Sequence, residues 1–226
     1  MTDKAKDSAV EDDNADVPQL SMDTMKALLE FYKEQEDRES KRKEIAEGNI
    51  PDSFDENWNM SQFWYTEETS EALAKECLRV LKDEEEIATV SCPTLYRSLR
   101  KLDEKVSKKV FEYDTRFAVY KEDFVFYDFK SPLDIPKDLR ERFSVVVADP
   151  PYLNEDCLAK TAITIRFIAK PNAKIILCTG AVMEEMAGKL LKLRKCSFPI
   201  KHHKALSNPF YCYANYDLDS KGELDE

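Results

Sequence analysis

The chain has 226 residues, enough for one domain of about 150–200 residues with a hydrophobic core and for additional tails. Its formal charge of −11 comes from its two ends: residues 1–57 carry 17 acidic and 8 basic side chains, and residues 217–226 carry 5 and 1. Residues 58–216 hold 23 acids against 25 bases and no basic run, so the strong positive footprint expected for duplex nucleic acid is missing. We therefore expect no nucleic-acid partner; the acidic ends suit a basic protein partner or solubility.

No apolar segment approaches the roughly 20 residues of a membrane span, and the acidic N-terminus is unlike a secretory signal. We therefore expect a cytoplasmic protein without a membrane partner, and a monomer. The cysteines are scattered, with no Cys-x-x-Cys pair and no cysteine–histidine cluster, so we predict neither a metal site nor a disulfide framework. Cys178 and Cys212 fall inside apolar strands and are expected to be small buried hydrophobes.

The N-terminal part predicts one helix between two irregular segments. Residues 1–19 are acidic, lack apolar clusters and are expected to be disordered. From Ser21, a candidate N-cap, a helix should run toward Lys43, and residues 48–55 have the composition of a linker. We favour a solvated helix at the domain edge over an arm that touches a protein substrate. The expected domains are 1–56, an acidic tail with helix and linker; 57–216, the main domain; and 217–226, an acidic tail.

After the linker, strands and helices alternate. The hydrophobic pattern predicts helices at 67–81, 95–106 and 154–168, the last capped by Asn154, and another helix around Met183 to Leu190. Predicted strands are 87–91, 109–114, 124–127, 143–149, 174–179, 196–200 and 210–216. The last two have no helix between them, so they are expected to be an antiparallel pair. This order predicts an α/β fold with a doubly wound, mostly parallel sheet.

The most informative segment is a buried strand that runs into Asp149-Pro150-Pro151-Tyr152. Its residues Val145 to Ala148 are apolar without alternation, as in a parallel strand buried on both faces. Asp149 then lies at the carboxyl end of the strand, where open α/β sheets bind ligands. The two prolines stiffen the loop and remove two N–H donors, which leaves carbonyls, a carboxylate and an aromatic ring. Such a set of acceptors suits a substrate that donates hydrogen bonds, above all an amino group.

This motif resembles the signature of class I S-adenosylmethionine-dependent methyltransferases that modify amino groups. Four segments together resemble the eukaryotic elongation factor 1-alpha lysine methyltransferase family, formerly described as adenine-N6 DNA methyltransferases. They are Ser61–Thr66, Phe111–Phe117, Val147–Leu153 and Leu177–Ala181, within a match over roughly residues 54–217. The resemblance implies a seven-stranded sheet, S-adenosylmethionine as cofactor, a lysine of elongation factor 1-alpha as substrate, and Asp149 to Tyr152 as the catalytic motif.

The resemblance also suggests where the cofactor's methionine end binds. Most enzymes of this class have a glycine-rich turn after the first strand, but residues 90–94 contain no glycine. Another segment should then supply contacts, and the candidates are Gln62, Phe63, Trp64, Tyr65 and Thr66. Thr66 is an expected helix N-cap, whose free N–H groups could hold the cofactor carboxylate. The alternative is an aromatic cluster that closes the end of the sheet.

Acidic residues at successive strand ends predict the rest of the cofactor site. Glu112 follows the second strand, where its carboxylate can accept both ribose hydroxyls, whereas Asp114 should cap the next turn. Asp128, after the third strand, is placed to accept the adenine amino group, with Phe129 or Tyr113 against the ring. Ser91 and Asp149 complete the predicted cofactor-binding set.

Nitrogen methylation requires a neutral amine, and holding a free lysine neutral at pH 7.4 costs about 4 kcal/mol. An apolar pocket lowers the pKa of the amine, and Asp149 can orient the nitrogen or take its proton. Tyr152 can stack on a planar base or lie against an ammonium group. These features fit lysine, glutamine and adenine alike, so the four motif residues do not choose between them.

The main alternative is an adenine-N6 nucleic-acid methyltransferase, against which stand the neutral central region, the acidic ends and the lack of a recognition domain. A second is an inactive methyltransferase fold that serves as a binding module; the intact motif with Glu112 and Asp128 argues against it. The two histidines, His202 and His203, are expected to be surface residues near a strand end rather than bases or substrate-orienting groups.

Overall fold

The computed structural model describes residues 21–50, 54–204 and 206–218. The chain divides into two compact units, Met1–Glu47 and Gly48–Glu226. The predicted disorder of residues 1–19 and most of the predicted acidic C-terminal tail lie outside the described residues, and the predicted boundary at residue 57 stays a prediction. Within the described part of the chain, no helix is both long enough and apolar enough to cross a membrane.

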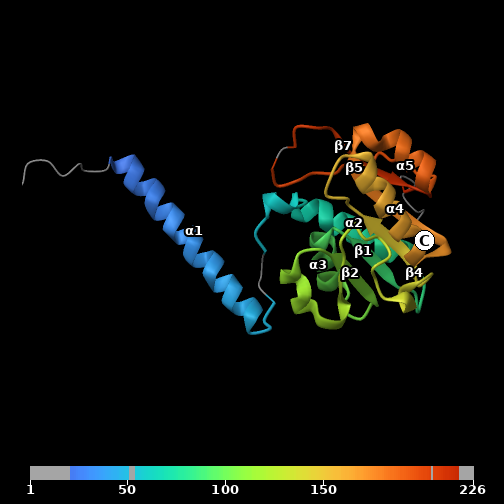
Figure 1. The fold of residues 1–226 in the computed structure, drawn as a ribbon, viewed down its shortest axis with the longest axis horizontal. Coiled ribbons are helices and arrows are strands. Elements are labelled where there is room, and N and C mark those ends of the chain that lie inside the picture. Colours follow the sequence, from blue (N-terminus) through green and yellow to red (C-terminus); the bar gives the residue numbers. More distant parts are fainter. Residues whose placement is uncertain (1–20, 51–53, 205, 219–226) are drawn as a thin grey trace, which may run out of the picture. The chain divides into compact units, whose positions relative to one another are not determined.

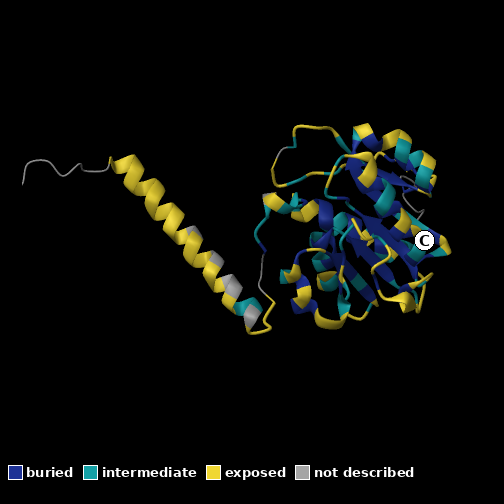
Figure 2. Cartoon of the chain, viewed as in Figure 1, coloured by how far each residue is buried: buried dark blue, intermediate teal, exposed yellow. Residues whose placement is uncertain are grey.

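The first unit contains helix α1, Met22–Ala46 (blue in Figure 1). Ser21 caps it as predicted, because its hydroxyl accepts the Thr24 N–H at 3.1 Å. The helix continues past Lys43, the predicted end. Its large apolar side chains, Met22 and Leu29 among them, are exposed (Figure 2), so the side chains of α1 that the structure describes form no core by themselves.

The second unit is built on a seven-stranded sheet with the strand order β3-β2-β1-β4-β5-β7-β6. Strands β1 to β5 pair in parallel, whereas β7 is antiparallel to both β5 and β6. The predicted mostly parallel sheet with an antiparallel C-terminal pair is therefore confirmed. The strands are β1 Ile87–Val90, β2 Lys108–Glu112, β3 Phe124–Phe126, β4 Phe143–Ala148, β5 Ala169–Gly180, β6 Arg194–Lys195 and β7 Phe210–Ala214.

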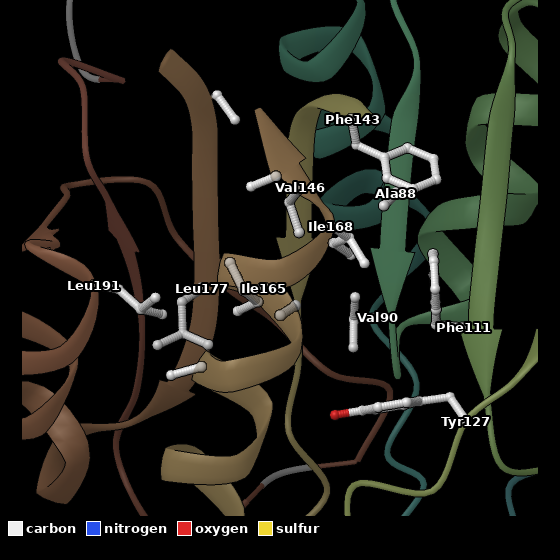
Figure 3. Close-up of a cluster of buried hydrophobic side chains, with 14 of the residues drawn as sticks. Ala88, Val90, Phe111, Tyr127, Phe143, Val146, Ile165, Ile168, Leu177 and Leu191 are labelled. Atoms are coloured by element: carbon white, nitrogen blue, oxygen red, sulfur yellow. The ribbon is translucent and has the colours of Figure 1, made fainter. Parts of the chain in front are cut away.

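Helices cover both faces of this sheet (Figure 1). The side chains of β4 alternate: Val145 and Val147 pack in the core with α2 and α3, while Val146 packs in the core with α4 and α5. Figure 3 shows the second of these cores, where Val146 and Leu177 of the sheet lie near Ile165 of α4. The predicted burial of β4 on both faces is thus confirmed. The helices are α2 Glu67–Val80, α3 Pro93–Leu102, α4 Glu155–Ile168, α5 Glu184–Leu191 and the short η1 Trp58–Met60, η2 Thr115–Asp123, η3 Lys137–Leu139 and η4 Ala181–Met183.

Two predicted elements are corrected. The strand predicted at 196–200 is wrong: β6 consists of Arg194 and Lys195, and Pro199, which has no N–H, cannot extend the ladder. The helix predicted to reach residue 106 ends at Leu102, because the Asp103 carboxylate accepts the N–H groups of residues 105 and 106 and forms a turn instead.

The strand order places the ligand-binding edge of the sheet. The chain crosses from β1 to β2 on one side, and β4 then pairs on the other side of β1. In open α/β sheets, ligands bind outside the carboxyl ends of the strands at this kind of reversal. Ser91 follows β1 and Asp149 follows β4, so both lie at that edge.

Deletion of residues 1–47 should leave the second unit folded, because the sheet and both cores lie within residues 48–226. We expect the melting temperature to change by less than about 3 °C, as judged by circular dichroism of the full and shortened chains. A much larger loss would mean that the first unit contributes to the stability of the second.

Candidate functional site

A cavity of about 510 Å³ lies at the carboxyl ends of the parallel strands, within the usual range for small-molecule sites. It brings together most of the predicted site residues. Those that line it are Gln62, Phe63, Trp64, Ser91, Glu112, Tyr113, Asp128, Phe129, Asp149, Pro150, Pro151 and Tyr152. Tyr65 and Thr66 do not line the cavity.

Asp149 is positioned by the sheet itself. Its N–H donates to the Val90 carbonyl at 3.0 Å, which extends the ladder between β1 and β4 by one residue. Burial raises the pKa of its carboxyl to about 7; contact with the buried Tyr65 hydroxyl opposes this rise, and the nearby charge of Glu112 adds to it. The Tyr65 hydroxyl interacts electrostatically with Asp149. It makes no hydrogen bond of ordinary geometry with any described residue.

Glu112 ends β2 with its carboxylate buried. Its Oε1 accepts the N–H groups of Tyr113 at 3.0 Å and Asp114 at 3.1 Å. Burial raises the pKa of Glu112 to about 7 in spite of these bonds. Within the described part of the chain, Oε2 accepts no hydrogen bond, so this oxygen is available to a ligand in the cavity.

Asp114 serves structure, as predicted. Its carboxylate accepts the Arg116 N–H at 3.0 Å and caps the turn after β2. The same carboxylate forms an ion pair with the Arg116 guanidinium at 2.6 Å and accepts the Gln62 amide at 2.9 Å. These bonds hold the segment before α2 against the end of β2. They also occupy the polar groups of Gln62, whose Oε1 accepts from Asn57 and Arg116, so its predicted cofactor contact stays a prediction.

The segment from Phe63 to Thr66 has divided roles. Phe63 is partly exposed on the cavity wall, and Trp64 is fixed by hydrogen bonds to Glu56 at 2.8 Å and to the Phe54 carbonyl at 3.1 Å. Thr66 caps α2 as predicted. Its own N–H is not free, however, because it donates to the Lys201 carbonyl at 2.9 Å. The predicted contact between the start of this helix and a cofactor carboxylate stays a prediction.

The turn after β1 contains no glycine. Ser91 adopts a φ of 55°, in the left-handed region, and its N–H donates to the Phe111 carbonyl at 2.8 Å. This conformation costs a non-glycine residue roughly 1 kcal/mol, so the surrounding contacts must hold it. The strained turn places Ser91 and Cys92 in the lining of the cavity.

The opposite part of the lining is aromatic. Asp128 Oδ1 accepts the Lys130 N–H at 2.9 Å, which orients the carboxylate after β3. Phe129 lies 5.6 Å from Tyr152, and Tyr113 lies 5.6 Å from Phe126, measured between ring centroids. The Tyr152 and Tyr113 rings are partly exposed and can contact a planar or cationic ligand.

One wall of the cavity was not predicted from sequence. It consists of residues in the connection between β6 and β7, and the expectation that His202 is a surface residue is wrong: it is half-buried and lines the cavity, while His203 is exposed. The connection has no hydrophobic periodicity, so only its contacts with Trp64 to Thr66 bring it to the site. Further lining residues that the sequence did not indicate are Asn59, Met60, Leu206, Ser207, Asn208 and Phe210.

Across the described ranges, no three histidine, cysteine, aspartate or glutamate side chains are grouped so as to hold a metal ion. The cysteines are all buried as free thiols, including Cys178 and Cys212 as predicted. The groups that line the cavity include the buried carboxylate of Glu112, the partly buried carboxylate of Asp149, several aromatic rings and one imidazole.

Comparison with known proteins identifies relatives along most of the chain. The family model described as "Probable N6-adenine methyltransferase" matches residues 56–218. The "EEF1A lysine methyltransferase 1" of Gallus gallus is 46% identical over 210 residues, covering 92% of this chain and 98% of that protein. That of Homo sapiens is 46% identical, with coverage of 93% and 96%, and a protein-lysine N-methyltransferase of Caenorhabditis elegans is 40% identical, with coverage of 90% and 96%.

A solved structure, a TehB-like SAM-dependent methyltransferase from Corynebacterium glutamicum, aligns with a TM-score of 0.44 at 16% identity. The alignment covers 80% of this chain and 95% of the chain of the solved structure.

The raised pKa of Glu112 predicts how stability depends on pH. The folded protein holds this proton up to about pH 7, whereas an unfolded glutamate loses it near pH 4.3. The contribution of Glu112 to stability is therefore highest below about pH 4 and is lost as the pH rises through about 7. Glu112→Gln should raise the melting temperature by roughly 5 °C at pH 8 and by little at pH 4.

Thermal melts of Glu112→Gln across this pH range check the prediction, with Glu122→Gln, at an exposed position, as the matched control. The same gain at both pH values would show that the charge of Glu112 is not its source.

Proposed function

Because the chain belongs to the EEF1A lysine methyltransferase family, we propose that it methylates a lysine of translation elongation factor 1-alpha, with S-adenosylmethionine as methyl donor. It is a methyltransferase, and its relatives of this name match it over nearly their whole length. The observation that carries the proposal is the shared cavity of Asp149, Glu112 and Tyr152 at the carboxyl edge of the sheet.

The residues present fit this cofactor. Bound S-adenosylmethionine supplies an electrophilic methyl group on a sulfonium cation. The free Oε2 of Glu112 can accept ribose hydroxyls, and Asp128 can accept the adenine amino group beside Phe129 or Tyr113. The charges of Glu112, which is buried, and Asp149, which is partly buried, also suit a cationic ligand, because within the described chain no cation lies within ion-pairing distance of either.

Asp149 can take a proton from the substrate amine. Its pKa of about 7 lies roughly three pH units closer to that of a free lysine than an ordinary aspartate does. This reduces the free-energy cost of the proton transfer by about 4 kcal/mol. The Pro150 and Pro151 carbonyls remain acceptors on a backbone that has no N–H donors at these positions.

The electrostatics of the cavity favour lysine over adenine. Free lysine arrives as a cation, which the carboxylates of Glu112 and Asp149 attract, whereas adenine is neutral. The aromatic rim of Phe63 and Tyr152 can surround an alkyl chain and an ammonium group. Adenine methylation, which the description of the family model names, is the alternative that the assay below must exclude.

We also propose how the enzyme attracts its protein substrate, its oligomeric state and its location in the cell. The acidic ends of the chain would attract a basic surface of the protein substrate. A monomeric enzyme in the cytoplasm, where elongation factors work, would be consistent with this role.

Glu112→Ala should lower the affinity for S-adenosylmethionine by at least about tenfold, because it removes the acceptor for the ribose hydroxyls. Isothermal titration calorimetry measures this loss, with circular dichroism to verify folding and Glu122→Ala as the exposed control. Unchanged affinity would exclude Glu112 from the ribose site, and the occupied carboxylate of Asp114 would not be an obvious substitute.

Asp149→Ala should reduce methyl transfer to elongation factor 1-alpha by about 10²-fold or more while cofactor affinity stays within a few-fold of wild type, since the acceptor nitrogen loses its partner. Tyr152→Ala should behave similarly, whereas Tyr152→Phe should keep much activity if the ring face matters. Peptide mass spectrometry of purified elongation factor 1-alpha measures the product.

A parallel reaction contains adenine-bearing DNA. A methylated lysine peptide that disappears in Asp149→Ala supports the proposal. Methyladenine formed by the wild-type enzyme, with elongation factor 1-alpha unmodified, would refute it.

A further inference from the structure

His202 is held rigidly on the wall of the cavity. It forms an antiparallel bridge with Tyr65, and the flanking bonds from Thr66 N–H to the Lys201 carbonyl and from His203 N–H to the Trp64 carbonyl are both 2.9 Å. Its ring lies 5.2 Å from the Tyr65 ring and 4.9 Å, edge to face, from the Phe210 ring. The backbone and two aromatic contacts therefore fix the position of this imidazole.

Among the described residues, the nitrogen atoms of this imidazole have no hydrogen-bond partner. Within the described residues its side chain makes no hydrogen bond, although it is half-buried beside a polar cavity. Burial lowers the pKa of His202 to about 4, and the charge of Glu56 only partly opposes this. The ring is therefore neutral at pH 7 and offers one hydrogen-bond acceptor as well as one donor.

Asp149 and His202 are linked through Tyr65. The Tyr65 hydroxyl lies close to the Asp149 carboxylate, while its ring packs on His202. Both polar groups line the same cavity. The acceptors that face this part of the site thus come from two chain regions, the loop after β4 and the connection between β6 and β7.

A neutral lysine amine carries two N–H donors and one lone pair, and the lone pair must point at the methyl carbon. A single acceptor leaves the amine free to rotate about its C–N bond, whereas two acceptors fix the direction of the lone pair. We propose that His202 is the second acceptor: its neutral imidazole binds one N–H of the substrate amine while Asp149 binds the other. The inference rests on the proposed lysine methyltransferase function.

The decisive variant is His202→Phe, which keeps an aromatic ring against Tyr65 and Phe210, slightly larger than imidazole, and removes both nitrogen atoms. We expect kcat/KM for elongation factor 1-alpha to fall about tenfold, the loss typical of one hydrogen bond in a transition state, with affinity for S-adenosylmethionine within about twofold of wild type. His202→Asn or His202→Gln, which restores an acceptor near one ring nitrogen, should recover part of the activity. His203→Phe, at the exposed neighbouring position, should have no effect.

A second readout does not depend on turnover. The chain has only two histidines, so NMR of the ring protons resolves them, and the signal missing from His202→Phe identifies His202. That ring should stay neutral down to about pH 5, as its burial requires. A ring already protonated at pH 6 would overturn the proposed acceptor role.

The outcomes separate the two proposals. An active wild-type enzyme with a fully active His202→Phe would refute the role of His202 alone. So would a loss of cofactor affinity as large as the loss of kcat/KM, because it would indicate a structural effect. A wild-type enzyme that leaves every lysine of elongation factor 1-alpha unmodified would instead refute the proposed function.

Discussion

Two carboxylates at one cavity, Glu112 buried and Asp149 partly buried, are the constraint on which the site depends. Glu112 ends β2 and Asp149 follows β4, the two strands that flank β1. Burial raises the pKa of each carboxyl group to about 7. Burying such groups costs free energy that their few hydrogen bonds do not recover. When a cationic ligand enters, the same carboxylate charges stabilise the ligand, which offsets part of this cost in a region with little water. The cavity is therefore suited to a sulfonium cofactor and an amine substrate.

The sheet topology explains why these groups meet. Parallel strands all end at one edge, so the residues that follow β1, β2, β3 and β4 converge although they are far apart in the sequence. The antiparallel strand β7 adds the remaining wall, because the connection that precedes it returns to the same edge and pairs with Tyr65. Tyr65, which was expected to contact the cofactor, has a different position. It is buried, does not line the cavity, and contacts both Asp149 and His202.

Strain in the first turn shows how the fold compensates for an unusual sequence. The chain has four glycines, and none of them lies in the turn directly after β1. Ser91 takes the left-handed conformation instead, fixed by its hydrogen bond to Phe111. The segment before α2 is fixed separately, through the bonds of Gln62, Asp114 and Arg116. Hydrogen bonds and an ion pair therefore hold both backbone segments at this end of the sheet.

The sequence by itself determined the elements that short-range patterns control. Unalternating apolar strands, the N-caps Ser21, Thr66 and Asn154, and acids at strand ends follow local rules, so the fold class and the positions of Glu112, Asp128 and Asp149 could be predicted. Tertiary structure alone decided the rest. The pKa values depend on burial, the Thr66 N–H is taken by a residue 135 positions away in the sequence, and His202 reaches the cavity only through its bridge to Tyr65. Such long-range pairing leaves no periodic signal in the segment that makes it, because the contact is specified by the folded sheet and not by neighbouring residues.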